Sequence, residues 1–208
     1  MDNISLIRET LKPHLKWHGA RLSFLALFLI SLFRVKTVNL AELSTGFMEN
    51  AKIESNYKRL QRFLREFDFD YYSFAKLVIE MMSIPEPWVL STVIAPSYAT
   101  TLIDDYAQRW GIETLFGIFK SRGFNLEDTH LVDSERLSRL FALLTIALCW
   151  ACRTGKWLHE QKPIKIKKHG RKAKSVFRYG FDYLRHIFLN LEDNETNFFH
   201  SLKFLSCT

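Results

Sequence analysis

The sequence predicts a mainly helical protein, and three observations support this fold class. Glycine is scarce, at 8 of 208 residues, whereas phenylalanine is abundant, at 18, a composition that favours packed helices over a turn-rich β protein. Hydrophobic residues make up 48% of the chain and charged residues 25%, as in globular proteins with a buried core. Apolar residues also recur at helical spacing through residues 1–84.

Residues 1–84 are predicted to form an N-terminal bundle of five helices joined by short connections. The predicted helices cover residues 4–11, 20–35, 39–46, 54–67 and 71–82. Asn39 is a favourable N-cap for the third helix, and Gly46 is a favourable residue at its end. In the second, the apolar run from Leu22 to Phe33 is only 12 residues long. A bilayer span needs roughly 18 to 20, so this run predicts a buried core helix.

The fourth predicted helix carries a cationic face opposite its apolar residues. The cations are Lys58, Arg59, Arg62 and Arg65. Two interpretations are open at this point. The face is either an ordinary solvated surface or the DNA-contacting helix of a helix-turn-helix-like bundle, in which the cations would neutralise phosphates.

Residues 85–208 are predicted to form a second region with one short strand and three helices. Pro85 and Pro87 end the bundle, and the β-branched stretch from Trp88 to Ile94 predicts the strand. Helices are predicted at about 100–121, 134–153 and 176–191. Asp133 or Ser134 is expected to cap the second of these. The tail beyond residue 191 is left unassigned.

One segment, residues 162–178, carries the whole basic excess of the chain. Lysine and arginine total 29 against 22 aspartate and glutamate, a net charge of +7. Eight of these cations lie in the segment, which contains no acidic residue. The rest of the chain therefore holds 21 cations and 22 acidic residues and is nearly neutral. Because it contains Pro163 and Gly170, the segment is expected to be an exposed loop. It is either a solvated loop or a binding surface for an acidic partner, most simply nucleic acid.

Three cysteines do not build a disulfide framework, which favours a reducing cytoplasm. Cys149 and Cys152 form a C-x-x-C pair at the end of an apolar helix. This pair is either a zinc or redox site or two buried small hydrophobes. The seven histidines have no paired-ligand spacing, and the chain lacks a glycine-rich phosphate loop. Neither a histidine-bound metal nor ATP use is therefore predicted.

Four polar residues fall on one side of the helix predicted at about 100–121. At 100° per residue, Tyr106, Arg109, Glu113 and Lys120 share an arc of about 60°. A carboxylate flanked by a hydroxyl and two cations suits a site for a phosphodiester. The carboxylate can bind a divalent metal while the other groups position phosphate oxygens. Arg109 and Glu113, four residues apart, can equally form an ordinary surface ion pair.

These four residues, with two, three and six residues between them, match the Y-R-E-K signature. The chain thereby resembles the DDE transposases of bacterial insertion sequences, family four. The stretches RWGIETLFGIFKSRGFNLEDTH, ERLSRLFALLTIALCWA and NYKRLQRFL also resemble that family. The resemblance implies an RNase H-like catalytic domain, in which two aspartates and one glutamate bind Mg²⁺ for cleavage and transfer of DNA strands.

The resemblance also assigns roles to individual residues. It implies that Glu113 is the catalytic, metal-binding glutamate. It implies that Tyr106, Arg109 and Lys120 contact transposon-end DNA. In a protein that handles DNA, four cations of the basic segment are expected to contact the backbone as well. They are Lys165, Lys167, Lys168 and Arg171.

The chain departs from that family because it has no room for the central sheet. In the family, both aspartates lie on strands between a sequence like Trp88 to Ser91 and the glutamate helix. The stretch from Trp88 to Gly111 is only 24 residues long, which implies an internal deletion that removes both aspartates. Asp104 and Asp105, on or just before the glutamate helix itself, are poor substitutes. The expected fold is an N-terminal helical bundle followed by the C-terminal helices of an RNase H-like transposase whose central sheet is largely missing.

The expected function is that of a cytoplasmic transposase-family protein that is catalytically inactive as it stands. Its expected partners are transposon-end DNA and either an intact transposase or a second copy of itself, with no membrane. Two alternatives remain open. One is a DNA-binding remnant that inhibits an intact transposase, and the other is an unrelated small helical nucleic-acid-binding protein.

Overall fold

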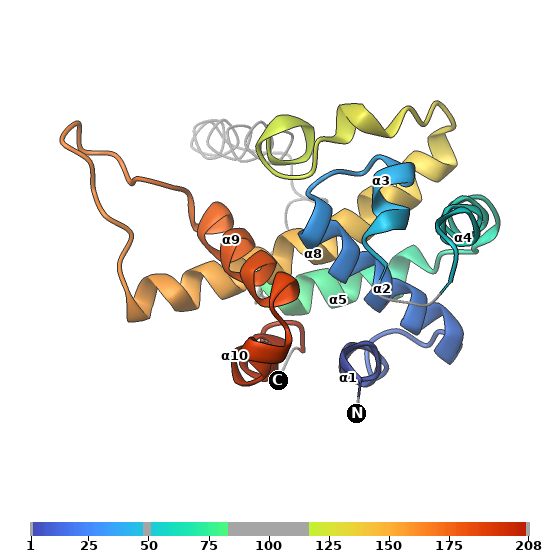
Figure 1. Cartoon of the computed structure of the whole chain (residues 1–208), viewed down its shortest axis with the longest axis horizontal. Helices are drawn as coiled ribbons and strands as arrows, with labels where there is room; N and C mark the ends of the chain where they lie inside the picture. The colour runs from blue at the N-terminus through green and yellow to red at the C-terminus, as the bar shows by residue number, and fades with distance from the viewer. Residues whose placement is uncertain (1, 48–50, 83–116, 207–208) are drawn as a thin grey trace, which may run out of the picture.

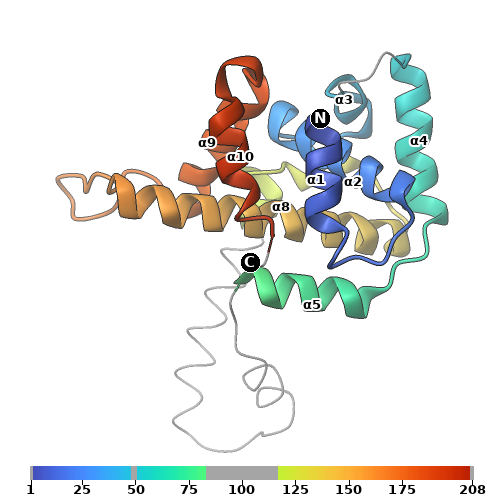
Figure 2. The same ribbon diagram turned by 90° about the horizontal axis from the view of Figure 1, so that it is seen from below.

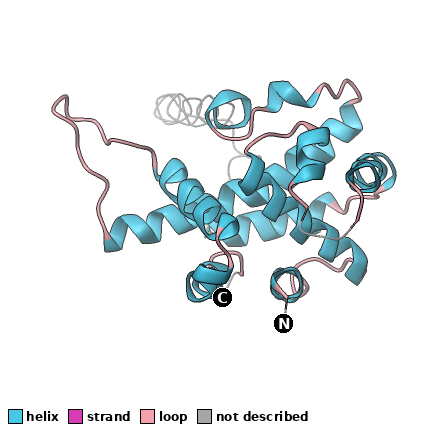
Figure 3. Ribbon diagram, viewed as in Figure 1, coloured by secondary structure: helices cyan, strands magenta, loops and turns pink. Residues whose placement is uncertain are grey.

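A computed structural model describes residues 2–47, 51–82 and 117–206, although not the side chains of residues 121 and 122. Every regular element in these ranges is helical (Figure 3). The mainly α fold class is therefore confirmed for the described part of the chain. The strand predicted from Trp88 to Ile94 and most of the helix predicted at about 100–121 lie outside the described residues.

The five helices predicted in the N-terminal region are confirmed, with boundaries that differ by at most one residue. They are α1 (Asn3–Leu11), α2 (Gly19–Val35), α3 (Leu40–Thr45), α4 (Ile53–Glu66) and α5 (Tyr71–Met82). The predicted cap of α3 is also confirmed, because the Asn39 side chain accepts hydrogen bonds from the N–H groups of Ala41 and Glu42. Helix α2 is the core helix that its apolar run predicts, since Leu22 and every residue from Phe24 to Phe33 are buried.

The longest element is α8 (Ser134–Gln161), along which the other helices are arranged (Figures 1 and 2). Its N-cap is Asp133, whose carboxylate accepts a 2.8 Å hydrogen bond from the N–H of Arg136. The helix continues eight residues beyond its predicted end at Arg153. Thr154 and Gly155, in this extension, are buried, so tertiary packing rather than apolar periodicity extends the helix.

Among the described residues, α8 is the one helix long and apolar enough to span a membrane, by length and composition alone. In its most apolar window, 56% of the helix is buried inside the protein. A mostly buried helix of this kind is typical of a protein core.

The C-terminal region adds short helical turns and two further helices. It comprises the π-helical turn η1 (Ile118–Arg122), the 3-10 turns η2 (Leu126–Thr129) and η3 (Glu192–Asn194), α9 (Val176–Leu189) and α10 (Glu195–Leu202). Helix α9 confirms the prediction at 176–191 with an end two residues earlier. Helix α10 forms in the unassigned tail, where Phe198, Leu202 and Leu205 are buried at helical spacing.

One hydrophobic core joins the N-terminal and C-terminal regions. The Phe33 ring of α2 lies 5.6 Å from Trp150 of α8 and 5.2 Å from Phe181 of α9, measured between centroids. Phe188 of α9 stacks on Phe33 at 5.7 Å. The regions before and after residue 84 therefore pack on each other. Their division into two separate domains stays a prediction.

Candidate nucleic-acid interface

The connection between α8 and α9, residues 162–175, projects from the helical body and is called the basic hairpin below (Figure 1). The sequence predicts an exposed loop here. The structure adds an antiparallel pairing, in which the N–H of Lys167 donates to the carbonyl oxygen of Arg171 at 2.8 Å. The N–H of Ala173 donates to the carbonyl oxygen of Lys165 at the same distance. The loop thus folds back on itself as a hairpin held by a single antiparallel bridge between Ile166 and Lys172.

A tight turn closes the tip of the basic hairpin. The N–H of Gly170 donates a 2.9 Å hydrogen bond to the carbonyl oxygen of Lys167, and Gly170 has φ of +78°. This is the geometry of a three-residue hairpin loop that ends in a left-handed glycine. The pair His169-Gly170, flanked by alternating residues, is the sequence signal that could have predicted the hairpin.

The tip of the basic hairpin presents four cations without counter-charges in the described part of the chain. Lys165, Lys167, Lys168 and Arg171 are exposed, and none of them forms an ion pair with a described residue. Two other cations of the basic segment differ, because Lys174 and Arg178 pair with Asp182 at 3.3 and 2.9 Å. The charge at the tip is therefore available to an external anion, whereas the charge at the start of α9 is partly neutralised.

The base of the basic hairpin is fixed to the end of α8. The N–H of Ile164 donates a 2.9 Å hydrogen bond to Nδ1 of His159, and the Ile164 side chain is 8% exposed. Across the base, the Tyr179 hydroxyl lies 3.4 Å from the carbonyl oxygen of Lys162, to which it donates. Both contacts hold the first residues of the hairpin, Lys162 and Ile164, against α8 and α9.

The predicted signature helix is described only at its end. Tyr106, Arg109 and Glu113 lie outside the described residues, so their arrangement on one helix face stays a prediction. Lys120 lies on η1, is exposed, and has its Nζ 3.8 Å from Oε1 of Glu127. Because η1 has π-helical rather than α-helical hydrogen bonding, the assumption of 100° per residue does not hold across Lys120.

The turn that carries Lys120 packs against the body of the protein beside the start of α9. Phe119 lies 5.4 Å from Phe141 of α8, and Phe124, just after η1, lies 5.8 Å from Phe177 of α9, measured between ring centroids. The end of the basic hairpin leads directly into this part of α9. Lys120 and the hairpin thus belong to neighbouring parts of the fold.

The cationic face predicted on α4 is also present. Lys58, Arg62 and Arg65 are exposed, whereas Leu60 and Leu64 are buried. Helix α4 and the basic hairpin lie at opposite ends of the molecule in both views (Figures 1 and 2). The two cationic surfaces are therefore separate.

Neither the cysteine pair nor the described acidic residues form a metal centre. Cys149 is 1% exposed, and burial raises the pKa of the Cys152 thiol to about 11, which favours the interpretation as packed, protonated side chains. Within residues 2–47, 51–82 and 117–206, no three His, Cys, Asp or Glu side chains converge as a metal site would require. Glu113, to which the resemblance assigns the Mg²⁺ ion, lies outside these ranges, so its metal role stays a prediction.

Comparison with known protein families relates part of the chain to transposases. Residues 89–150 match the family model described as "Transposase DDE domain". The match covers Tyr106, Arg109, Glu113 and Lys120 and extends into α8. No curated protein and no solved structure matches the chain.

Proposed function

We propose that the protein is an internally deleted relative of the insertion-sequence transposases of family four that binds transposon-end DNA without cutting it. The proposal of DNA binding rests on the tip of the basic hairpin, where four exposed cations pair with no described carboxylate. The match of residues 89–150 to a transposase domain supports DNA as the polyanion.

The geometry of the basic hairpin suits backbone contact. A hairpin of two antiparallel chain segments is narrow enough to enter a DNA groove, and lysine and arginine neutralise phosphates. His159 and Tyr179 hold the first residues of the hairpin against α8 and α9, so the hairpin projects from a fixed starting point. In this proposal Lys165, Lys167, Lys168 and Arg171 contact phosphates, and Tyr106, Arg109 and Lys120 add contacts from the signature helix.

The catalytic part of the proposal rests on the sequence. Of the three carboxylates that the resemblance implies, only Glu113 is matched, and Mg²⁺ prefers several carboxylate and water oxygens in an octahedral arrangement. We therefore assign Glu113 as the remnant of the metal-binding glutamate and assign no catalytic step to this chain. Its role is then DNA binding in the cytoplasm, alone, as a homodimer, or together with an intact transposase that it inhibits.

The salt dependence of DNA binding tests this proposal. Each phosphate contact contributes about 0.9 to the slope of log K against log salt concentration. Replacing Lys165, Lys167, Lys168 and Arg171 together by glutamine should reduce the magnitude of that slope by about 3 to 4. The control replaces four exposed lysines elsewhere, Lys12, Lys52, Lys76 and Lys203, and removes the same total charge. An equal reduction in both variants would mean that only net charge attracts DNA.

The kind of DNA separates the proposal from the alternative of an unrelated nucleic-acid-binding protein. A transposase relative should prefer the terminal repeats of its element over scrambled duplexes of the same length and composition. Equal affinity for both at moderate salt would favour a general nucleic-acid-binding protein instead.

A further inference from the structure

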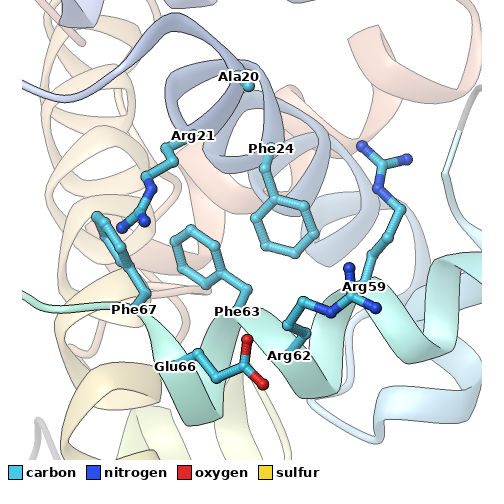
Figure 4. A pocket seen from close by; sticks show the side chains of 8 residues that line it. All are labelled: Ala20, Arg21, Phe24, Arg59, Arg62, Phe63, Glu66 and Phe67. Atoms are coloured by element: carbon cyan, nitrogen blue, oxygen red, sulfur yellow. The ribbon is translucent and has the colours of Figure 1, made fainter.

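A groove between α2 and α4 holds three arginines around a floor of aromatic rings (Figure 4). It has a volume of about 270 Å³. Arg21 and Phe24 come from α2, whereas Arg59, Arg62, Phe63 and Glu66 come from α4 and Phe67 directly follows its last residue. The lining residues are Ala20, Arg21, Phe24, Arg59, Arg62, Phe63, Glu66 and Phe67.

The aromatic rings hold two of the guanidinium groups in place. The Cζ of Arg21 lies 4.2 Å from the centroid of the Phe67 ring, and that of Arg59 lies 5.9 Å from the centroid of Phe24. The rings are themselves packed, with Phe24 stacked on Phe63 at 4.4 Å. A planar guanidinium on a ring face keeps its N–H groups directed outward at its edge, so less side-chain entropy is lost when an anion binds.

The charge in the groove is only partly balanced. Within the described residues, Arg21 and Arg62 form no ion pair, and Glu66 is the only carboxylate of the lining. The hydrogen bond from Arg65 holds the pKa of the Glu66 carboxyl below its usual range, and the nearby charge of Arg62 contributes to the same shift. The groove therefore presents more positive than negative charge, on a preorganised surface.

We propose that this groove binds a phosphate group and that its ligand is a backbone phosphate of the DNA. Arginine forks match phosphate oxygens in two-point hydrogen bonds. The volume is below the range of about 300–1,000 Å³ that is typical of cofactor and drug-sized sites, which fits one phosphate with its flanking sugars. This inference rests on the proposed DNA binding and adds a second contact, at the end of the molecule opposite the basic hairpin.

The first test removes the charges one at a time. Arg21→Gln and Arg62→Gln should each reduce the magnitude of the salt slope by about 0.9, and the double variant by about twice that. Lys58→Gln, on the same helix but outside the groove lining, is the control and should change the slope by less than half as much. An unchanged slope in the double variant, or an equal effect of Lys58→Gln, would overturn the inference.

The second test asks whether the arginine fork and its ring matter beyond charge. Arg21→Lys keeps the charge, so the salt slope should stay near that of the unaltered protein while the affinity at fixed salt falls several-fold. Full affinity in Arg21→Lys would indicate an unspecific electrostatic surface and would count against a built phosphate site.

The third test separates DNA from free phosphate and from the proposed function. Inorganic phosphate, titrated by calorimetry at constant ionic strength, serves as the probe of the free anion. Phosphate binding that is lost in the double variant, with unchanged DNA binding, would overturn DNA as the ligand. If DNA binding depends on the basic hairpin but not on Arg21 and Arg62, the groove does not contact DNA, whereas the proposed function still holds. If the unaltered protein binds no DNA, both proposals fail.

Discussion

Gly155 of α8 and Gly180 of α9 bring the backbones of these two helices into direct contact where they cross. A Cβ atom added to Gly180 would lie 2.5 Å from the backbone nitrogen of Gly155 and 1.9 Å from the carbonyl oxygen of Ala151. A Cβ added to Gly155 would lie 2.0 Å from the carbonyl oxygen of Val176. Because the basic hairpin connects α8 to α9, this crossing also determines how the hairpin leaves the body of the protein.

Alanine at either glycine of the crossing should destabilise the fold. Overpacking of a close contact typically costs about 1–3 kcal/mol, and here the obstructing atoms belong to the backbone, which cannot rotate away. Urea unfolding of Gly180→Ala should therefore show a midpoint well below that of the unaltered protein. Gly19→Ala is the control, since a Cβ there meets nothing within 4 Å and alanine favours helix. Equal midpoints for both variants would contradict the close crossing.

The turn of the basic hairpin should depend on its left-handed glycine. Gly170 has φ of +78° and open space around it, so an alanine there suffers backbone strain of about 1–2 kcal/mol without a steric clash. Gly170→Ala should weaken DNA binding while leaving global unfolding almost unchanged, because the tip contributes nothing to the core. Gly170→Asn should retain most of the affinity, since asparagine tolerates this conformation. An equal loss of DNA affinity in both variants would contradict this explanation, because it would show that any side chain at position 170 weakens binding, whatever its tolerance of a positive φ.

Arg139 should stabilise the end of α4. Its Nη1 donates to the carbonyl oxygens of Leu64 at 2.7 Å and Arg65 at 2.8 Å, in the last turn of that helix, and its side chain is 14% exposed. Hydrogen bonds from charged groups contribute about 1.5–3 kcal/mol, so Arg139→Gln should lower the free energy of unfolding by that order. Arg136→Gln removes a more exposed arginine from the same helix and should cost under about 1 kcal/mol. Similar losses would refute the capping role.

The partly buried thiol of Cys152 should make stability fall at alkaline pH. Burial raises its pKa from 9.0 to about 11, so between these values the folded state keeps a proton that the unfolded state releases. The contribution is complete below pH 9 and decreases by about 1.4 kcal/mol per pH unit through this window. Relative to Cys152→Ala, the unaltered protein should therefore lose about 2 kcal/mol between pH 8 and pH 11 in urea unfolding. A constant difference between the two proteins would contradict a buried, protonated thiol.

The helix boundaries were predictable from the sequence where apolar periodicity and capping residues act locally. Asn39 and Asp133 cap the helices they were expected to cap. The end of α8 was predicted too early because Gly155 weakens a helix in isolation, whereas in the fold it admits the backbone of α9. Helix α10 was missed because its apolar residues are spaced among polar ones in a short segment.

The sequence predicted where positive charge gathers in the candidate site, but it did not predict how the charged side chains are arranged. The run of cations that includes Lys165 and Arg171 predicted an exposed basic surface, and the structure adds the strand pairing that shapes it. On α4, the spacing of Arg59 and Arg62 predicted a cationic face. The position of Arg21 over Phe67 was not predictable, because it depends on how α2 and α4 pack across the bundle. Contacts between distant segments have no local signal in a single sequence.

The purified chain should not cut DNA. Two-metal cleavage needs ions about 3.5 to 4 Å apart, held by carboxylates from different elements, one ion activating the attacking oxygen and the other stabilising the leaving oxygen. Of the three carboxylates that the resemblance implies, only Glu113 is matched in this chain, and Arg109, four residues earlier, would favour an ion pair with it. Nicking assays on terminal-repeat DNA with Mg²⁺ or Mn²⁺ should therefore give no product, and Glu113→Ala should give the same result. Metal-dependent cleavage that disappears in Glu113→Ala would contradict the proposal of an inactive, internally deleted chain. It would mean that Asp104, Asp105 or a second subunit completes the site.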